Sequence, residues 1–161
     1  MSVLATTPEK QLESWVSFLR SHAAITRELS AQLQQEHGLT LNDYEVLLHL
    51  SHADGGRLRR VDLAERVLLT ASGITRLLEG LERAGLVCKE TCASDARVSY
   101  AKLTDDGLET LRAAATTHLR GIDELFLSRY SGSELATLAE LLGRLPVTGT
   151  DCKASPSAPC S

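Results

Sequence analysis

Aromatic residues are scarce in this sequence: Phe, Trp and Tyr together make up 4% of its 161 residues, and there is one Trp. The hydrophobic core must therefore be built mainly from Leu, Val, Ile and Ala side chains. No stretch approaches the roughly 18 consecutive apolar residues of a membrane span. The N-terminus also lacks the basic and apolar segments of an export signal. We therefore expect one cytoplasmic domain with an appended tail and no membrane partner.

Motifs for catalysis and for metal binding are missing as well. The sequence has no Gly-rich phosphate loop and no G-x-S-x-G nucleophile motif. Its Cys and His residues do not follow the order and spacing of a zinc site. His49 and His52 form the only close His pair. The sequence thus predicts neither an enzyme nor a protein with a cofactor or a metal.

Four cysteines are present, and the lack of an export signal favours free thiols. In an extended strand the Cα atoms of Cys88 and Cys92 would lie roughly 13 Å apart, whereas a disulfide spans at most roughly 7 Å. A bend near Glu90 could shorten this distance, so a bond between them is disfavoured but not excluded. Cys152 and Cys160 lie in the tail and could cross-link to a partner.

The formal net charge is −4, which is unusual for a protein that binds nucleic acid. The charge is unevenly distributed, however, because residues 57–97 contain eight basic and six acidic residues. Such a distribution permits a DNA-binding centre within an acidic frame.

Helix-start and helix-stop signals divide the N-terminal part of the chain. Thr7-Pro8 begins an amphipathic helix of about 28 residues, which ends near Gly38. Asn42 begins a second helix through the capping-box pattern N-D-Y-E. We expect His52 to point inward from this helix. A break at residues 54–56 and the basic run RLRR follow.

The central segment predicts two short helices joined by a few residues. The first covers about 61–67, and the second is capped by Thr70 or Ser72 and closed by Gly85. This pattern is typical of a helix-turn-helix. The periodicity then changes, and the runs LVCKE and RVSYAKL indicate an antiparallel hairpin. Together these elements form a winged helix-turn-helix.

The C-terminal part is helical again. Thr104 caps a long helix that reaches about Arg129, and the box Ser131-x-x-Glu134 begins a last helix that Pro146 ends. We expect a mainly α (α+β) protein with an N-terminal dimerisation helix in 1–40, a DNA-binding domain in 41–104, C-terminal dimerisation helices in 105–146 and a disordered tail in 147–161.

Several segments of the chain resemble the MarR (multiple antibiotic resistance regulator) family of bacterial transcription factors. They are GLTLNDYEVLLHL, VDLAERVLLTASGITRLLEGLERAGLV, the triplet Asp95-Ala96-Arg97 and LTDDG, in the family's order and spacing. The resemblance runs from about Trp15 to Leu145. It implies a homodimeric repressor, less often an activator, that binds a pseudo-palindromic operator and responds to a small molecule or an oxidant.

A helix-turn-helix places the start of its second helix in the major groove. We therefore expect DNA contacts from Ser72, Gly73, Thr75 and Arg76, with Gly73 allowing close approach of the backbone and Arg76 donating to guanine or phosphate. In the wing, Arg97 is the candidate for the minor groove. Asp95 would orient its guanidinium, and Lys89 would contact a phosphate.

The terminal helices carry more apolar surface than a small winged domain can bury, so we expect them to dimerise. The predicted dimerisation residues are Leu12, Leu19, Leu125, Leu138, Leu142 and Leu145. An aromatic anion would suit a pocket with rings and cationic side chains. The ligand candidates are Trp15, Arg20, His22, Tyr44, His49 and His52; Trp15 resembles a Trp in the first helix of some urate- and phenol-responsive relatives, and it is otherwise expected to anchor the core.

Two alternatives to a ligand-released repressor remain open at this stage. One is a redox-sensing regulator that uses Cys88, Cys92, Cys152 and Cys160. The other is a protein-interaction adaptor that uses the winged fold, which the acidic net charge allows.

Overall fold

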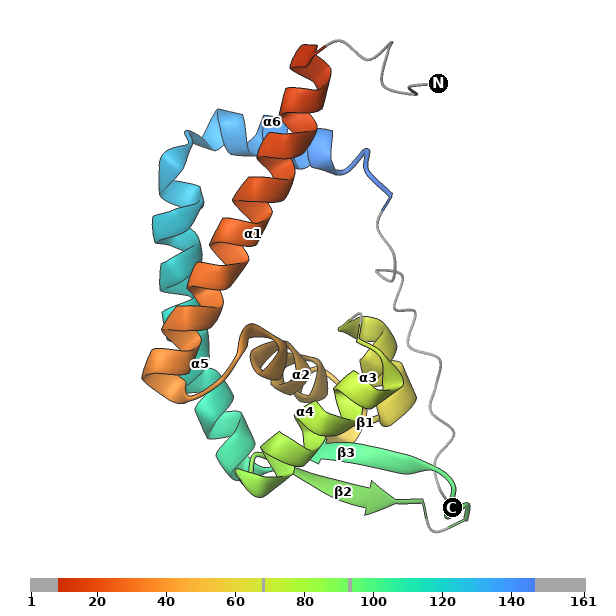
Figure 1. The fold of residues 1–161 in the computed structure, drawn as a ribbon. Coiled ribbons are helices and arrows are strands. Elements are labelled where there is room, and N and C mark those ends of the chain that lie inside the picture. Colours follow the sequence, from red (N-terminus) through yellow and green to blue (C-terminus); the bar gives the residue numbers. More distant parts are fainter. Residues whose placement is uncertain (1–8, 68, 93, 147–161) are drawn as a thin grey trace, which may run out of the picture.

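The computed structural model describes residues 9–67, 69–92 and 94–146 (Figure 1). The predicted start at Thr7-Pro8 and the predicted tail lie outside this part of the chain. In order, the elements are α1 (Glu9–His37), α2 (Leu41–Ser51), the 3-10 turn η1 (Asp54–Gly56), β1 (Arg57–Arg59), α3 (Arg60–Arg66), α4 (Ala71–Arg83), β2 (Val87–Thr91), β3 (Ser99–Leu103), α5 (Asp105–Leu125), η2 (Leu127–Arg129) and α6 (Gly132–Leu142). None of the described helices is long and apolar enough to cross a membrane. The predicted winged-helix fold and its order of elements are confirmed.

The helix caps follow the sequence signals, with one correction. Thr70 and Thr104 accept hydrogen bonds from the amides three residues later, and Ser131 forms the predicted box with Glu134. The prediction that Asn42 caps α2 was wrong. Thr40 is the cap, because its hydroxyl accepts from the Asp43 amide while the Asp43 carboxylate accepts from the Thr40 amide.

The sheet has three strands in the order β1-β3-β2, all antiparallel. The sequence predicted only the β2–β3 hairpin and treated RLRR as a basic connection. In the structure Arg57–Arg59 pairs with Tyr100–Lys102, more than forty residues later in the chain. A strand of three residues is too short to show a period in the sequence. Its partner strand also lies far along the chain, so no local hairpin signal marks it.

A single hydrophobic cluster joins the winged domain to the long helices. Its largest fully buried side chains come from α1, α2, α3 and α4, and they include Leu33, Leu47, Leu50, Leu63, Ile74 and Leu78. Figure 1 shows α2, α3, α4 and the sheet gathered at one end of α1 and α5, with α6 toward the other end. His52, expected to point inward from α2, is exposed.

A polar network joins the end of α1 to the middle of α5. Thr117, which is buried, donates its hydroxyl hydrogen to Glu36 Oε2 at 2.8 Å. His37 Nε2 lies 2.8 Å from the same hydroxyl oxygen and therefore donates to it. The hydrogen bond from Thr117, followed by the charge of Arg120, lowers the pKa of Glu36. Two charged groups and a hydroxyl thus hold the two long helices in register.

The long helix α5 is shorter than predicted. It ends at Leu125 rather than near Arg129, because Phe126 leaves the helical conformation with φ −132° and ψ −64°. The 3-10 turn η2 follows and leads into α6. This bend redirects the chain, so that α6 does not continue along the axis of α5 (Figure 1).

Candidate nucleic-acid interface

The N-terminal turn of α4 presents the predicted DNA-reading residues. Ser72 and Arg76 are exposed, while Ile74 and Leu78 point into the core. Arg76 has no ion-pair partner among the described residues, so its guanidinium is available to a ligand. The amphipathic spacing therefore fixes which side of α4 faces outward.

Gly73 leaves room for the hydroxyl of Thr70, which caps α4. Its amide donates to Thr70 Oγ1 at 3.1 Å, and a Cβ at this position would lie 3.2 Å from the same oxygen. A side chain would thus crowd the hydroxyl that caps the helix. Thr75 is likewise occupied, because its hydroxyl donates to the Ala71 carbonyl oxygen at 2.9 Å. Thr75 can still accept from DNA, whereas the close approach predicted for Gly73 remains a prediction.

The wing carries its predicted pair of charges. Asp95 Oδ1 accepts from both the Arg97 amide, at 3.0 Å, and the Arg97 Nε, at 3.2 Å. The Arg97 side chain is 92% exposed, and its terminal nitrogens make no hydrogen bond within the described chain. The predicted orienting hydrogen bond is present, and contact with DNA stays a prediction. Lys89, on the edge strand β2, is also exposed and lacks an ion-pair partner in the described ranges.

The three arginines of the basic run RLRR each form an ion pair with a carboxylate of the protein. Arg57 pairs with Glu90 at 2.8 Å, Arg59 with Asp62 at 2.8 Å and Arg60 with Glu82 at 3.0 Å. These arginines therefore add less to the free positive charge of the domain than their number suggests. The Arg60–Glu82 pair is largely shielded from water and joins the start of α3 to the end of α4.

This geometry agrees with three comparisons. Residues 37–98 match a family profile described as MarR family. AbsC from Streptomyces coelicolor, a MarR family transcriptional regulator, is 34% identical in sequence, and its structure superposes with a TM-score of 0.77 over 84% of this chain and 91% of its own. The chain belongs to the MarR family. It is a transcriptional regulator by that membership, and the predicted family resemblance is confirmed.

Two further relatives extend the comparison. Sco3205, a MarR family transcriptional regulator from Streptomyces coelicolor solved in complex with DNA, is 28% identical, with a TM-score of 0.79 over 87% of this chain and 94% of its own. The HTH-type transcriptional regulator MhqR of Bacillus subtilis (strain 168) is 27% identical over 137 residues, which are 85% of this chain and 92% of MhqR.

The predicted ligand residues of this MarR-family chain fall into two groups on different helices. Trp15, Arg20 and His22 are exposed on α1, where Phe18 lies between the rings of Trp15 and His22 at centroid distances of 6.2 and 6.5 Å. Trp15 is 56% exposed, so the expectation that it anchors the core of the single chain was wrong. Phe18 was not singled out from the sequence.

The second group lies on α2. Tyr44 is buried against His118 of α5, with ring centroids 4.5 Å apart, and burial raises the pKa of Tyr44 and lowers that of His118. His49 is half-buried, and its pKa is lowered by burial and then by the charge of Arg66. Neither the depression along α6 nor the one beside Glu79, Glu82 and Arg83 is lined by a residue of either group.

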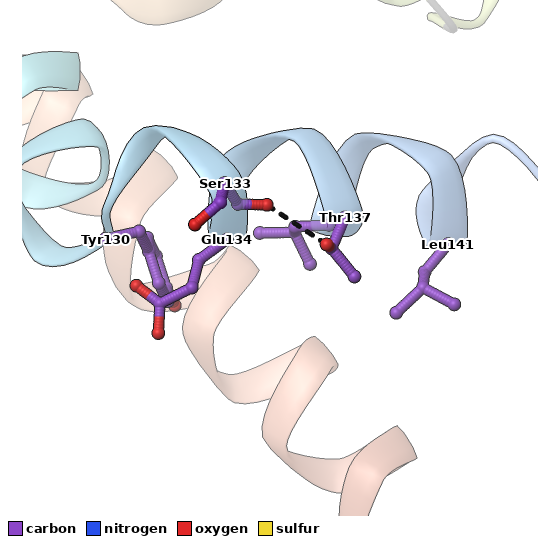
Figure 2. Close-up of a pocket in the computed structure, with 6 residues that line it drawn as sticks. Tyr130, Ser133, Glu134, Thr137 and Leu141 are labelled. Atoms are coloured by element: carbon purple, nitrogen blue, oxygen red, sulfur yellow. Dashed lines mark hydrogen bonds between the residues drawn. The ribbon is translucent and has the colours of Figure 1, made fainter.

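The predicted dimerisation leucines are incompletely covered in the single chain. Leu12, Leu19 and Leu145 are exposed, and Leu125, Leu138 and Leu142 are half-buried. A shallow depression of about 370 Å³ runs along α6 (Figure 2). Its lining residues are Tyr130, Ser133, Glu134, Thr137, Leu138 and Leu141. Tyr130 and Leu141 were not predicted from the sequence, because helix spacing shows which residues share a face but not which face remains uncovered.

The wing cysteines occupy different environments. Cys88 is a free, exposed thiol, which rules out a Cys88–Cys92 bond in this structure. Cys92 is buried, and its Sγ lies 3.1 Å from Ser94 Oγ. Cys92 is disulfide-bonded, so the expectation of free thiols is wrong at this position. Cys152 and Cys160 lie outside the described residues, and the redox alternative stays untested.

Proposed function

We propose that the chain is a homodimeric repressor that binds a pseudo-palindromic operator and is released from it by a small aromatic anion. The observation that carries the DNA-binding part is a pair of exposed arginines. Arg76 at the start of α4 has no ion pair in the described residues, and Arg97 at the tip of the wing pairs with Asp95 through its Nε alone. One would enter the major groove with its helix and the other the adjacent minor groove. The DNA complex of Sco3205 supports this proposal.

The uncovered apolar side chains of the terminal helices support a second copy as partner. On α1 these are Leu12, Trp15, Val16, Phe18 and Leu19, each at least 39% exposed, and Leu141 and Leu145 add to them near the C-terminus. A soluble monomer rarely leaves so many neighbouring apolar groups in water. A dimer would also place two α4 helices about one helical turn of DNA apart, which a palindromic operator requires.

The row of rings on α1 supports an aromatic anion as effector. Trp15 and Phe18 offer faces for stacking, and His22 in the same row offers a ring nitrogen to a carboxylate or phenolate. A ligand held there would lie on the surface proposed for dimerisation. Its binding would therefore change the spacing of the two recognition helices, and with it the affinity for the operator.

A DNA-binding titration tests the proposal in two parts. A duplex selected by the protein from a randomised pool should contain two inverted half-sites, and a duplex with one half-site should bind much more weakly. Leu19→Arg should give a monomer in light scattering and lose the preference for two half-sites. A wild-type monomer at micromolar concentration would refute the dimer. Unchanged affinity across a panel of aromatic carboxylates and phenols would refute the effector.

A further inference from the structure

A cluster of charged and aromatic side chains lies at the base of the wing. The Arg57 guanidinium of β1 donates to Glu90 Oε1 of β2 at 2.8 Å and lies over the ring of Tyr100 of β3, with its carbon 5.2 Å from the ring centroid. Lys102 of β3 approaches Glu90 Oε2 at 3.7 Å. All three strands thus contribute to one interaction, although β1 and β2 are not adjacent in the sheet.

The strand register explains why these residues meet. Arg57 is paired with Lys102 and Glu90 with Tyr100, so alternation places all four on the same face of the sheet. The opposite face carries Ala101, which is completely buried against the helices. The arrangement therefore leaves the cluster on the outer face, where about a third of the Arg57 and Glu90 side chains is exposed.

We propose that Arg57 is a positioning residue for DNA binding, which sets the angle of the wing through Glu90 and does not contact DNA itself. Glu90 is on the β2 strand that leads to the wing tip, and Arg57 is on the strand that continues directly into α3. The ion pair therefore connects the hairpin to the helix-turn-helix across β3. When the pair is intact, Arg97 and the start of α4 are held at a fixed separation.

A competing account makes a different prediction about charge. If Arg57 were a phosphate contact, Glu90 would only compete with DNA for it, and removing the Glu90 charge would strengthen binding. If Arg57 acts through Glu90, removing either partner frees the hairpin and weakens specific binding. Glu90→Gln removes one negative charge from the DNA-binding domain in both accounts. The change in DNA affinity nevertheless has opposite signs: binding strengthens if Arg57 contacts phosphate and weakens if Arg57 acts through Glu90.

The experiment measures fluorescence anisotropy of the selected duplex at several salt concentrations, with full-length protein. We expect Arg57→Ala and Glu90→Gln each to weaken binding about tenfold, a loss equivalent to about 1.4 kcal/mol, and to leave the salt slope unchanged. Arg57→Lys, which retains the charge, should recover part of the affinity. Glu79→Gln is the matched control: it removes an exposed acid of α4 that has no ion pair in the described residues, and it should not weaken binding.

The outcomes separate this inference from the proposed function on which it rests. If the wild type selects no sequence, the proposed function fails. Two results would show that Arg57 is a phosphate contact and that the positioning role is wrong, provided that the wild type binds. One is tighter binding by Glu90→Gln. The other is a salt slope lowered by about 0.9 in Arg57→Ala, as expected when one neutralised phosphate is given up. Thermal unfolding of each variant identifies any loss of affinity that comes from loss of fold. If Arg57→Ala does not fold, the affinity and salt slope of Arg57→Lys are used instead.

Discussion

Gly107, in the first turn of α5, is expected to tolerate no side chain. A Cβ there would lie 2.0 Å from the carbonyl oxygen of Leu86 and 2.8 Å from Leu103 Cδ1. The Leu86 oxygen cannot move away freely, because it accepts a hydrogen bond from the Thr104 amide at 3.1 Å. Thr104 in turn donates its hydroxyl hydrogen to the Gly85 carbonyl oxygen and caps α5. This close approach joins the winged domain to the helices of the proposed dimer.

Gly107→Ala must therefore separate α5 from the turn that follows α4. We expect it to lower the free energy of unfolding by about 3 kcal/mol, the upper end of what overpacking costs. For a chain of this size, that loss corresponds to a drop in melting temperature of roughly 6–12 °C. The assay is thermal and urea unfolding at one fixed protein concentration, because dimerisation makes the melting temperature depend on concentration.

Two other glycines provide matched controls. A Cβ at Gly80 of α4 would meet nothing within 4 Å, so Gly80→Ala should stabilise the protein by about 0.5–1 kcal/mol through the better helix propensity of Ala. At Gly121 the nearest atoms are the ends of the Gln32 and Leu29 side chains, which can shift, so the loss should be smaller than at Gly107. Equal melting temperatures for Gly107→Ala and wild type would refute this account of the joint.

Two further predictions concern the wing and pH. Arg97→Ala should leave the melting temperature nearly unchanged, since an exposed ion pair contributes under about 1 kcal/mol. It should weaken operator binding in gel shifts. Retained affinity with an unchanged salt slope would show that Arg97 does not contact DNA. Burial lowers the pKa of His118, so the unfolded chain takes up its proton first and stability falls as pH decreases below the ordinary value of 6.5. In His118→Gln, the difference in unfolding free energy between about pH 7.5 and 5.5 should therefore be smaller; an identical difference would show that His118 is protonated equally in both states.

Local signals in the sequence predicted much of the fold. The starts of α5 and α6 were predicted correctly from Thr104 and Ser131. An N-cap side chain bonds to an amide only three residues later, so the signal is local in the sequence. The apolar spacing that assigned Ile74 and Leu78 to the core also decided that Arg76 faces outward. At Asn42 the same reasoning misplaced the cap by two residues, since both Thr40 and Asn42 can serve as caps and the sequence does not rank them.

What could not be predicted depends on interactions between distant segments. Arg57 looked like part of a basic run, but its role follows from pairing with Lys102 and from the carboxylate of Glu90. The need for glycine at position 107 depends on where the Leu86 carbonyl lies. Trp15 was expected inside and is outside, because helix periodicity identifies an apolar face without showing whether this chain or a second copy covers it.

The most direct test of the central claim is a footprint on the DNA upstream of the protein's own gene. We predict two protected half-sites in inverted orientation, with centres about 10–10.5 base pairs or a multiple of that apart, and protection that declines steeply as salt increases. Arg76→Ala should lose this protection while keeping the melting temperature of the wild type. Absence of any protected sequence, or equal protection by Arg76→Ala, would contradict the account.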